Sequence, residues 1–367
     1  MRKGWEYKKL GEVGTFLRGK NILKSDFVEK GLPCIHYGQI HTKFGISTDT
    51  HLTETSQEVY NKAIIASKND VLIAITSEDL EGSCKATAWL GDYDVAVSAH
   101  AAVFKHNLNP KYIVYYLKSQ SFYIEKSKYA RGFKVMEIKP TDIAKIPIPI
   151  PPKSTQFAIV SELDKINELI RLKKEQLKDF DNLAQSLFYE MFGDPVENEK
   201  GWEVKKLGEV YKMKSGDSLS TKSFEEGDIP VYGGNGISGY HNKYNKDGSY
   251  IIIGRVGVYC GNVRIVKGRF WLTDNAFELL YDNSSQNEVF VCSLLTHLNL
   301  RQYANAAAQP VISNNTLKHV SIPLPPLPLQ HLFAHRIDQI EHQKAEVQKA
   351  ITDLETLLAS RMQYWFE

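Results

Sequence analysis

Apolar residues recur at alternating steps of four and three along two segments that are otherwise polar. The first series runs from Ile159 to Leu187 with one charged interruption at Lys173, and the second runs from Phe333 to Leu358 with a matching interruption at Lys344. Because so narrow an apolar stripe on a long helix is normally buried by another helix, the pattern predicts two long helices that pack against each other. The predicted seam comprises Ile159, Leu163, Ile166, Ile170, Leu177, Phe180 and Leu187 in the first helix and Phe333, Ile337, Ile340, Val347, Ile351, Leu354 and Leu358 in the second. The two lysines either set the register of the pair or extend their ammonium groups into water at its edge.

The chain also contains an internal repeat. The repeated stretches are GWEYKKLGEV at 4–13 against GWEVKKLGEV at 201–210, and IPIPIPPKSTQ at 146–156 against IPLPPLPLQ at 322–330. The second pair precedes the two long helices and aligns Gln156 with Gln330. Because the offset falls from 197 residues at the first pair to 174 at the second, we expect the second copy to be shorter by 23 residues, nearly all of them lost opposite residues 33–98.

Short apolar runs between the repeated stretches indicate strands. VLIAI at 71–75, YIIIG at 250–254 and VRIV at 263–266 lie among turn-forming residues. Each region also holds one helical pattern before its close, beginning at Pro110 and at Glu288. We therefore expect two β-rich α+β domains. The predicted organisation is a first domain over 1–152, a first long helix over 153–194, a second domain over 195–326 and a second long helix over 327–367.

Composition and charge narrow the possible classes of protein. The 367 residues are 43% hydrophobic and 24% charged, which is typical of a globular chain with room for two domains. Since neither a membrane-spanning run nor a signal peptide is evident, a cytoplasmic location is expected. The four cysteines form no C-x-x-C pair, so reduced and mostly buried thiols are expected rather than a zinc or redox site. Positive charge is concentrated in the first region, with 21 Lys and Arg against 16 Asp and Glu in 1–152, compared with 14 against 13 in 195–326.

No set of residues in the sequence indicates catalysis. A G-x-G-x-x-G pattern begins at Gly234, but the residues after it lack helical periodicity, so a glycine-rich loop is favoured over a dinucleotide site. Glu203 and Lys205, with Asp194 upstream, only loosely match a metal-dependent nuclease motif, and their place in the repeated opening favours a framework role. The G-x-x-x-x-G-K-[ST] phosphate loop is also missing from the sequence.

Side chains that hydrogen-bond to bases and phosphates are instead abundant in the loops of both regions. Arg and Lys can read guanine, Asn and Gln can read adenine, and all of them can bind phosphate. Arg255 is the strongest candidate, because Gly254 and Gly257 beside it would let the backbone approach a ligand closely. The candidate DNA contacts are Gln39, His41, Lys43, Ser77, Lys85, His100, Arg131 and Lys134 in the first region and Asn235, Tyr240, His241, Asn242, Lys243, Arg255, Asn262, Arg264, Gln309, Asn314 and Asn315 in the second.

The combination of these features resembles the specificity subunit of type I restriction-modification enzymes. The features are the doubled G-W-E-x-K-K-L-G-E-V openings, the two divergent regions, the proline-rich exits and the paired helices that end near Met191-Phe192 and Trp365-Phe366. The resemblance covers essentially the whole chain. It implies an α+β fold in which two target recognition domains are separated by two long antiparallel helices that form a coiled coil, with an internal pseudo-two-fold repeat. Each domain would read one half of a split target in double-stranded DNA.

The resemblance also implies partners that carry the chemistry. Two methyltransferase subunits would dock on the helices and the nearby framework, and restriction subunits would join through them. S-adenosylmethionine, ATP and magnesium would belong to those partners, so this chain is expected to bind no cofactor or metal, to have no catalytic residues of its own and to have no membrane partner.

The length of the predicted helices gives the coiled coil a second role. A helix of about 40 residues is on the order of 60 Å long, whereas one turn of DNA spans roughly 34 to 36 Å. We therefore expect the coiled coil to set the number of unread base pairs between the two half-sites. Two other functions stay open, namely a single-chain DNA nuclease that uses Glu203 and Lys205, and an adaptor whose tandem modules bind proteins or glycans instead of DNA.

Overall fold

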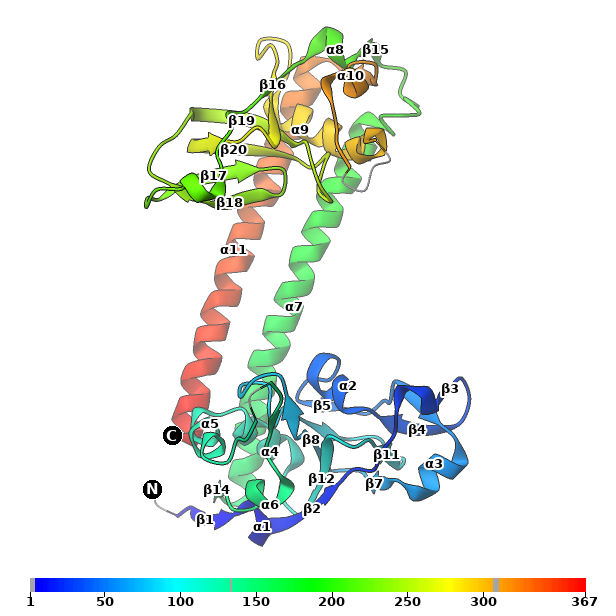
Figure 1. Ribbon diagram of the computed structural model, residues 1–367, viewed down its shortest axis with the longest axis vertical. Helices are drawn as coiled ribbons and strands as arrows, with labels where there is room; N and C mark the ends of the chain where they lie inside the picture. Colours follow the sequence, from blue (N-terminus) through cyan, green and yellow to red (C-terminus); the bar gives the residue numbers. More distant parts are fainter. Residues whose placement is uncertain (1–3, 133, 306–309) are drawn as a thin grey trace. The chain divides into compact units, whose positions relative to one another are not determined.

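The computed structural model describes residues 4–132, 134–305 and 310–367 (Figure 1). The chain folds into two compact units. The first unit comprises the residues up to Lys173 together with Ala350–Glu367, and the second unit comprises Lys174–Lys349. Each long helix therefore contributes one half to each unit instead of standing apart as a separate segment.

Two five-stranded sheets form the first unit, with strand orders β2-β12-β8-β10-β5 and β3-β6-β4-β11-β7. The strands are β1 (Glu6–Lys9), β2 (Gly14–Arg18), β3 (Phe27–Val28), β4 (Leu32–Ile35), β5 (Ser47–Thr48), β6 (Thr53–Thr55), β7 (Ile64–Ala66), β8 (Val71–Ala74), β9 (Thr76–Ser77), β10 (Ala86–Trp89), β11 (Val95–Val97), β12 (Ala101–His106), β13 (Met136–Glu137) and β14 (Pro147–Ile150). The shorter helices are α1 (Leu10–Val13), α2 (Tyr37–Thr42), α3 (Gln57–Lys62), α4 (Pro110–Leu117), α5 (Gln120–Ser127) and α6 (Pro140–Ile143), with a 3-10 turn η1 (Lys24–Asp26). The predicted strand at 71–75 and the predicted helix from Pro110 are both confirmed, as β8 and α4.

Strand β8 shows why the first unit needs two layers. Val71 and Ile73 face one cluster of buried side chains, whereas Leu72 and Ala74 face another. This alternation is the two-residue period of a strand, and burial on both faces explains its continuous apolar run.

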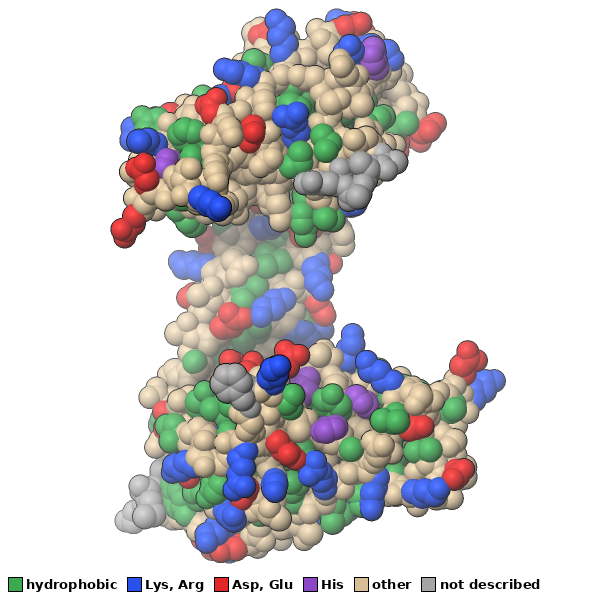
Figure 2. Space-filling view, viewed as in Figure 1, with side chains coloured by type: hydrophobic (Ala, Val, Ile, Leu, Met, Phe, Trp, Pro, Cys, Tyr) green, Lys and Arg blue, Asp and Glu red, His purple; other side chains and the backbone are tan. Residues whose placement is uncertain are grey.

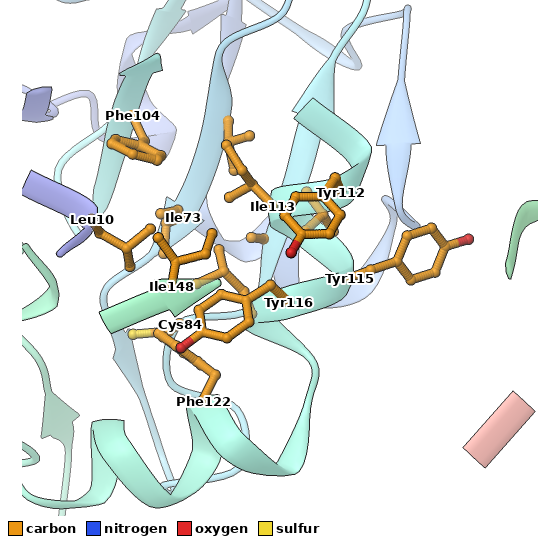
Figure 3. Packing of buried hydrophobic residues seen from close by; sticks show 14 of the residues in the cluster. Leu10, Ile73, Cys84, Phe104, Tyr112, Ile113, Tyr115, Tyr116, Phe122 and Ile148 are labelled. Atoms are coloured by element: carbon orange, nitrogen blue, oxygen red, sulfur yellow. The ribbon is translucent and has the colours of Figure 1, made fainter. Parts of the chain in front are cut away.

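The main core of the first unit lies between its sheet and helix α4 (Figure 3). Figure 3 shows Tyr112, Ile113 and Tyr116 of α4 among buried residues from several strands. The Tyr112 hydroxyl donates a hydrogen bond to the Pro149 carbonyl at 2.7 Å, and the Tyr116 hydroxyl donates to the Pro147 carbonyl. Both bonds fasten α4 to the proline-rich strand β14.

A six-stranded sheet forms the centre of the second unit, with the order β16-β21-β19-β20-β17-β18. Its strands and those of the framework are β15 (Glu203–Lys206), β16 (Lys212–Ser215), β17 (Ile229–Gly233), β18 (Gly236–His241), β19 (Lys246–Gly254), β20 (Val263–Leu272), β21 (Ala276–Leu280) and β22 (Ser321–Leu324). The shorter helices are α8 (Leu207–Val210), α9 (Glu288–His297) and α10 (Asn314–Leu317), with 3-10 turns η2 (Thr221–Ser223) and η3 (Leu300–Tyr303). The strands predicted from YIIIG and VRIV and the helix predicted from Glu288 are confirmed. The G-x-G-x-x-G pattern begins with Gly234 in the turn between β17 and β18 and continues into β18, so it joins two strands and does not lead into a helix.

The repeated sequence stretches form the same framework in each unit. Strand β1 pairs antiparallel with β14, and β15 pairs antiparallel with β22 over the same number of residues. The helices that follow begin alike, because the Lys9 N–H donates to the Glu12 carboxylate at 2.9 Å and the Lys206 N–H donates to the Glu209 carboxylate at 3.0 Å.

A buried glutamine joins each long helix to its unit. Gln156 accepts a hydrogen bond from the Asn109 N–H at 3.0 Å and donates one to the Pro151 carbonyl at 2.9 Å. Gln330 makes the same two bonds to the corresponding residues of the second unit, at 2.9 and 2.8 Å. Both side chains are only 1% exposed. The same polar joint therefore fixes the start of each helix.

The long helices α7 (Lys153–Phe192) and α11 (Leu327–Phe366) are each unbroken over 40 residues. Within the first unit, Arg361 of α11 forms an ion pair with Glu162 of α7. Within the second unit, the Lys344 ammonium lies 2.8 Å from the Asp181 carboxylate. Since early residues of one helix pair with late residues of the other, the helices run antiparallel. All the predicted seam residues are buried or half-buried, and the predicted α+β fold class with two long antiparallel helices is confirmed.

The first unit contains more structure than the second between its framework elements. Helices α2 and α3 and strands β5, β6 and β7 lie between β4 and β8, whereas the second unit passes from β17 through β18 directly to β19. These additions build much of the second sheet of the first unit.

Candidate nucleic-acid interface

Three histidine rings surround Tyr37 in the first unit. The centroid of the Tyr37 ring lies 4.5 Å from that of His36, 6.1 Å from that of His41 and 5.2 Å from that of His100. The Tyr37 N–H donates to the Ser98 hydroxyl at 2.9 Å, which brings the start of α2 against the loop before β12. Figure 2 shows histidine side chains gathered on the α2 side of the first unit, with lysine and arginine side chains nearby. These rings and their N–H groups can contact bases and phosphates.

Three of the predicted contacts line one cavity beside this cluster. His41, Ser77 and Lys85 border a hollow of about 690 Å³, together with Tyr37. The His41 Nε2 atom lies 2.9 Å from the Thr76 carbonyl oxygen, which fixes the orientation of the imidazole ring. Three carboxylates also line the cavity, those of Glu78, Asp79 and Glu81. Because carboxylates repel phosphate but accept hydrogen bonds from cytosine N4, this cavity suits base edges better than the DNA backbone.

The other candidates of the first unit differ in how free their side chains are. The Gln39 side-chain amide is already hydrogen-bonded within the unit, because it accepts from the His36 N–H at 3.0 Å and donates to the Thr53 hydroxyl at 3.2 Å. It therefore stabilises the start of α2. Lys43, Arg131 and Lys134 are exposed, as are Lys85 and His100.

In the second unit, exposed candidates lie on the β17-β18 hairpin. Asn235 is exposed in the two-residue turn, and Tyr240 is 55% exposed on β18. Arg264 on β20 packs beneath this hairpin, because a Cβ atom on Gly236 would lie 2.5 Å from the Arg264 Nη1 atom. Gly236 also has a φ of 105°, which favours glycine. The residues after the hairpin, Asn242 and Lys243, lie near Glu225, whose carboxylate accepts from the Asn242 amide at 2.7 Å and lies 3.9 Å from the Lys243 ammonium.

Arg255 directly follows strand β19, an interior strand of the sheet of the second unit, and its guanidinium is fixed by the fold. Its Nη1 donates to the Ser215 hydroxyl at 3.3 Å and to the Asp274 carbonyl at 3.2 Å, and the guanidinium carbon lies 5.1 Å from the centroid of the Phe277 ring. The Nε donor is buried and has no partner among the described residues. Such a half-buried guanidinium is preorganised for a ligand on its outer side.

The glycine beside Arg255 has a different role from the one predicted. A Cβ atom on Gly254 would lie 2.3 Å from the Gly234 carbonyl oxygen. Gly254 is therefore required where two backbone segments of the protein meet, instead of where a ligand approaches.

His241 is the most buried of the predicted DNA contacts that the structure describes in the second unit. Its side chain is only 3% exposed, and its Nδ1 accepts a hydrogen bond from the Glu225 N–H at 3.0 Å. The ring also meets Trp271 edge to face, with the centroids 5.7 Å apart. These contacts give His241 a structural role between β18 and β20, and its binding to DNA stays a prediction.

The remaining candidates lie near α10 and in the turn before β20. Asn314 donates to the Met213 carbonyl at 3.0 Å, and Asn315 accepts from the Lys318 ammonium at 3.1 Å. Asn262 is exposed. Gln309 lies outside the described residues.

Sequence reasoning missed Tyr37 and the acidic residues of the first cavity. Tyr37 lies between His36 and Gln39 in the sequence, so the density of polar candidates around it was the available signal. Glu78 and Asp79 are negatively charged and therefore do not fit a phosphate contact, so the pattern of basic and amide residues does not indicate them.

The residues of the nuclease alternative belong to the framework. Glu203 and Lys205 form an ion pair at 3.1 Å on the exposed strand β15, and Glu6 and Lys8 do the same at 2.7 Å on β1. Asp194 caps the turn after α7 by accepting from backbone N–H groups two and three residues further on. Within the part of the chain that the structure describes, no cluster of three His, Cys, Asp or Glu residues could hold a metal ion.

The cysteines are free, and three of the four are buried, as expected. Burial raises the pKa of Cys84 and of Cys292 to about 12. Both thiols are therefore protonated at neutral pH and poor nucleophiles. None of the helices in the described ranges combines the length and apolarity that crossing a bilayer requires.

Comparison with known proteins accounts for both copies of the repeat. Residues 2–179 and 199–356 match the type I restriction modification DNA specificity domain. The type I restriction enzyme EcoprrI specificity subunit of Escherichia coli is 30% identical over 245 residues, which cover 63% of this chain and 61% of that subunit. The chain thus spans less than two thirds of that relative's length.

Solved structures share the fold at low sequence identity. A chain from work on complex assembly and conformational transition of the type I R-M system has a TM-score of 0.68 at 19% identity, covering 100% of this chain and 98% of its own. The type I restriction-modification S subunit from M. genitalium has a TM-score of 0.60 at 17% identity, covering 99% of this chain and 96% of its own. With both halves of the repeat matched and the fold shared along its whole length, the chain belongs to the type I restriction-modification DNA specificity family.

Proposed function

We propose that this chain reads a bipartite and asymmetric DNA sequence, with one unit for each half-site. The observation that carries the proposal is a repeated framework with different contents. Strand pairs β1-β14 and β15-β22 and the buried glutamine joints recur, whereas helix α2, which carries Tyr37 and His41, has no counterpart among the described residues of the second unit. Matching frames with different loops favour two different half-sequences read in opposite orientations.

The coiled coil would set the spacing between the half-sites. Helices α7 and α11 have 40 residues each and are on the order of 60 Å long at about 1.5 Å per residue. Neither helix is interrupted, which supports a stiff spacer.

The long helices would also dock two methyltransferase subunits, through which restriction subunits join. Leucines that do not belong to the seam support this proposal, because Leu169, Leu172 and Leu183 of α7 are 46% to 50% exposed. Exposed leucines on a helix are a common feature of protein interfaces. S-adenosylmethionine, ATP and magnesium would be bound by those partners, and this chain would have no catalytic role.

Methylation mapping tests the proposal directly. The chain is co-expressed with its methyltransferase subunits in a host without other adenine methylation, and methylated adenines are mapped across the genome. We expect one split motif with a fixed spacer. A continuous motif, or methylation without sequence preference, would contradict the bipartite reading.

A domain exchange tests the assignment of one unit to each half-site. Replacing residues 20–145 with the equivalent segment of another family member should change one half of the motif and leave the other half and the spacer unchanged. A change in both halves would refute the modular assignment. An adaptor that does not bind DNA would show no salt-dependent DNA affinity in the same complex, whereas phosphate contacts always weaken with salt.

A further inference from the structure

The two units share a turn that is not evident from the repeated sequence stretches. In the first unit, the Cys84 N–H donates to the Ala74 carbonyl at 2.8 Å, and the Ala74 N–H donates to the Lys85 carbonyl at 2.8 Å. In the second unit, the Gly261 N–H donates to the Gly254 carbonyl at 2.7 Å, and the Gly254 N–H donates to the Asn262 carbonyl at 2.8 Å. Cys84 and Gly261 both have positive φ, 61° and 87°. Cys84 therefore corresponds to Gly261, and Lys85 corresponds to Asn262.

A cavity adjoins this turn in each unit. The first, of about 650 Å³, lies between the turn and the junction of α4 with α5, and the second, of about 490 Å³, lies between the turn and the junction of α9 with η3. Counting from the helix caps Asn109 and Asn287, Lys118 corresponds to Thr296 and Tyr123 corresponds to Arg301. Lys118 and Tyr123 line the first cavity, and Thr296 and Arg301 line the second, so the two cavities occupy the same place in the repeat.

The cavity of the first unit collects positive charge. Lys85, Lys118 and Lys126 line it, against one carboxylate, that of Glu81. The Lys126 side chain is only 4% exposed, and its ammonium donates to the carbonyls of Glu81 at 3.2 Å and Ser83 at 2.6 Å. Because an ammonium has three N–H donors, one remains available.

Lys85 repels both of the other cations, although burial is the larger cause of their lowered pKa values. Partial burial lowers the pKa of Lys118, full burial lowers that of Lys126, and repulsion by Lys85 lowers both further. The carboxylates of Asp79 and Glu81 act in the opposite direction on Lys126 but do not cancel the lowering. An anion in the cavity would relieve this repulsion.

The cavity of the second unit collects positive charge from different positions. Arg264 and Arg301 line it, and no acidic residue is among the described residues that do so. Neither arginine stands at a position that corresponds to one of these lysines, because Arg301 corresponds to Tyr123 and Arg264 lies two residues after the counterpart of Lys85. Both units therefore have cations around corresponding cavities, and these cations come from residues at different positions of the repeat. The shared framework alone does not explain this.

We propose that each of these two cavities binds a phosphate group of the DNA backbone, so that each unit has one phosphate anchor beside its base-reading loops. This inference rests on the proposed function. In the first unit, His41, Glu81 and Lys85 line both this cavity and the acidic one that suits base edges, so the two sites adjoin. Lysine supplies charge without the fixed geometry that base reading needs, which fits a backbone contact.

The test uses the full chain assembled with its methyltransferase subunits and measures affinity for duplexes with and without the mapped target at several salt concentrations. The variants are Lys85→Gln with Lys118→Gln for the first cavity and Arg301→Gln for the second, all at exposed side chains. Lys126 is left intact because its buried hydrogen bonds stabilise the fold. Exposed lysines away from both cavities, Lys30→Gln and Lys222→Gln, are the matched controls.

We expect each cavity variant to lose affinity by the same factor for target and non-target DNA. Each lost phosphate contact should also reduce the magnitude of the slope of log affinity against log salt by about 0.9. Between 50 and 200 mM salt, the variant should therefore lose roughly 3.5-fold less affinity than the wild type. The control variants should leave the slope at its wild-type value. Thermal unfolding of every variant confirms that it is folded.

Three other results would overturn the inference. Loss of affinity for target DNA alone would assign the residues to base reading, and an unchanged slope would remove the cavities from the interface. Saturable binding of inorganic phosphate at constant ionic strength, without a change in the DNA slope, would assign them to a free anion. A wild-type complex without any preference for its target would instead refute the proposed function itself.

Discussion

Replacing Gln156 with methionine should destabilise the first unit by removing the joint between α4, strand β14 and helix α7. The substitution keeps the side-chain length but leaves the Asn109 N–H and the Pro151 carbonyl without their partner. A buried backbone group without a partner costs about 1 to 3 kcal/mol. Pro151 is buried, whereas Asn109 is half-buried and can recover part of its loss from water.

The gain from the substitution is smaller than this loss. Methionine avoids burying an amide, which returns about 0.5 to 2 kcal/mol. We therefore expect a net loss of about 1 to 3 kcal/mol in the free energy of unfolding of the first unit. In a domain of this size that loss lowers the melting temperature by about 2 to 4 °C per kcal/mol.

The repeat supplies a matched second experiment. Gln330→Met removes bonds from the Asn287 N–H and to the Pro325 carbonyl at nearly the same distances, and Pro325 and Asn287 have the same burial as their counterparts. The loss in the second unit should therefore equal that in the first within about 1 kcal/mol. Gln57→Met, at an exposed position on α3, is the control and should change stability by less than about 0.5 kcal/mol.

Hydrogen exchange read by mass spectrometry distinguishes the two units. Gln156→Met should speed exchange in peptides of α4 and the start of α7, and Gln330→Met should do so in α9 and the start of α11. If both variants match the control, or if either one speeds exchange only in the opposite unit, the glutamine joint does not hold the helices as described.

Three further predictions concern the coiled coil and the second unit. Inserting one heptad after Leu177 and another opposite it in α11 lengthens the coiled coil by about 10 Å, or roughly three base pairs. Methylation mapping should then find a longer spacer with both half-sequences unchanged. An unaltered spacer would refute the spacing role. The hydrogen bond from Arg361, with one from Trp365 at 2.9 Å, holds the pKa of Glu162 below its usual 4.5. Because a lowered folded-state pKa stabilises the protein above the unfolded value, that stability should be lost as the pH falls below about 4.5, and urea unfolding of Glu162→Gln should not show this acid-dependent loss. Arg255→Ala should weaken discrimination by about 1 to 3 kcal/mol at one or two base pairs of a single half-site in binding assays with singly substituted duplexes, whereas an equal loss on every duplex would show that Arg255 contacts only the backbone.

The helices and the repeat were predictable because their signals are local and periodic. The seam from Ile159 to Leu187 follows the heptad period, and each of its residues is buried or half-buried. Strand β8 was predictable from a short apolar run. The order of strands in the sheets was not predictable, because it depends on pairings between residues far apart in the sequence, such as β4 with β11.

The candidate site was harder to predict because exposure is a tertiary property. His241 lies in a polar stretch, HNKYNKDG, that is typical of a surface loop, yet Trp271 from β20 covers it. Gln156 and Gln330 align with each other in the repeated sequence, but their burial depends on where other elements place Asn109 and Asn287. The two basic cavities were not visible at all, since their cations occupy positions that do not align.

Residues 350–366 supply part of the core of the first unit, and this arrangement has a consequence during protein synthesis. Phe366 is buried against Tyr112, with ring centroids 5.5 Å apart, and Trp365 stacks on Trp5 at 6.5 Å. The second unit is contiguous in the sequence and is synthesised before the segment that completes the first. The unit translated first is therefore incomplete until residues 350–366 are made, so a nascent chain that stalls before residue 350 would expose an unfinished hydrophobic surface to chaperones and proteases.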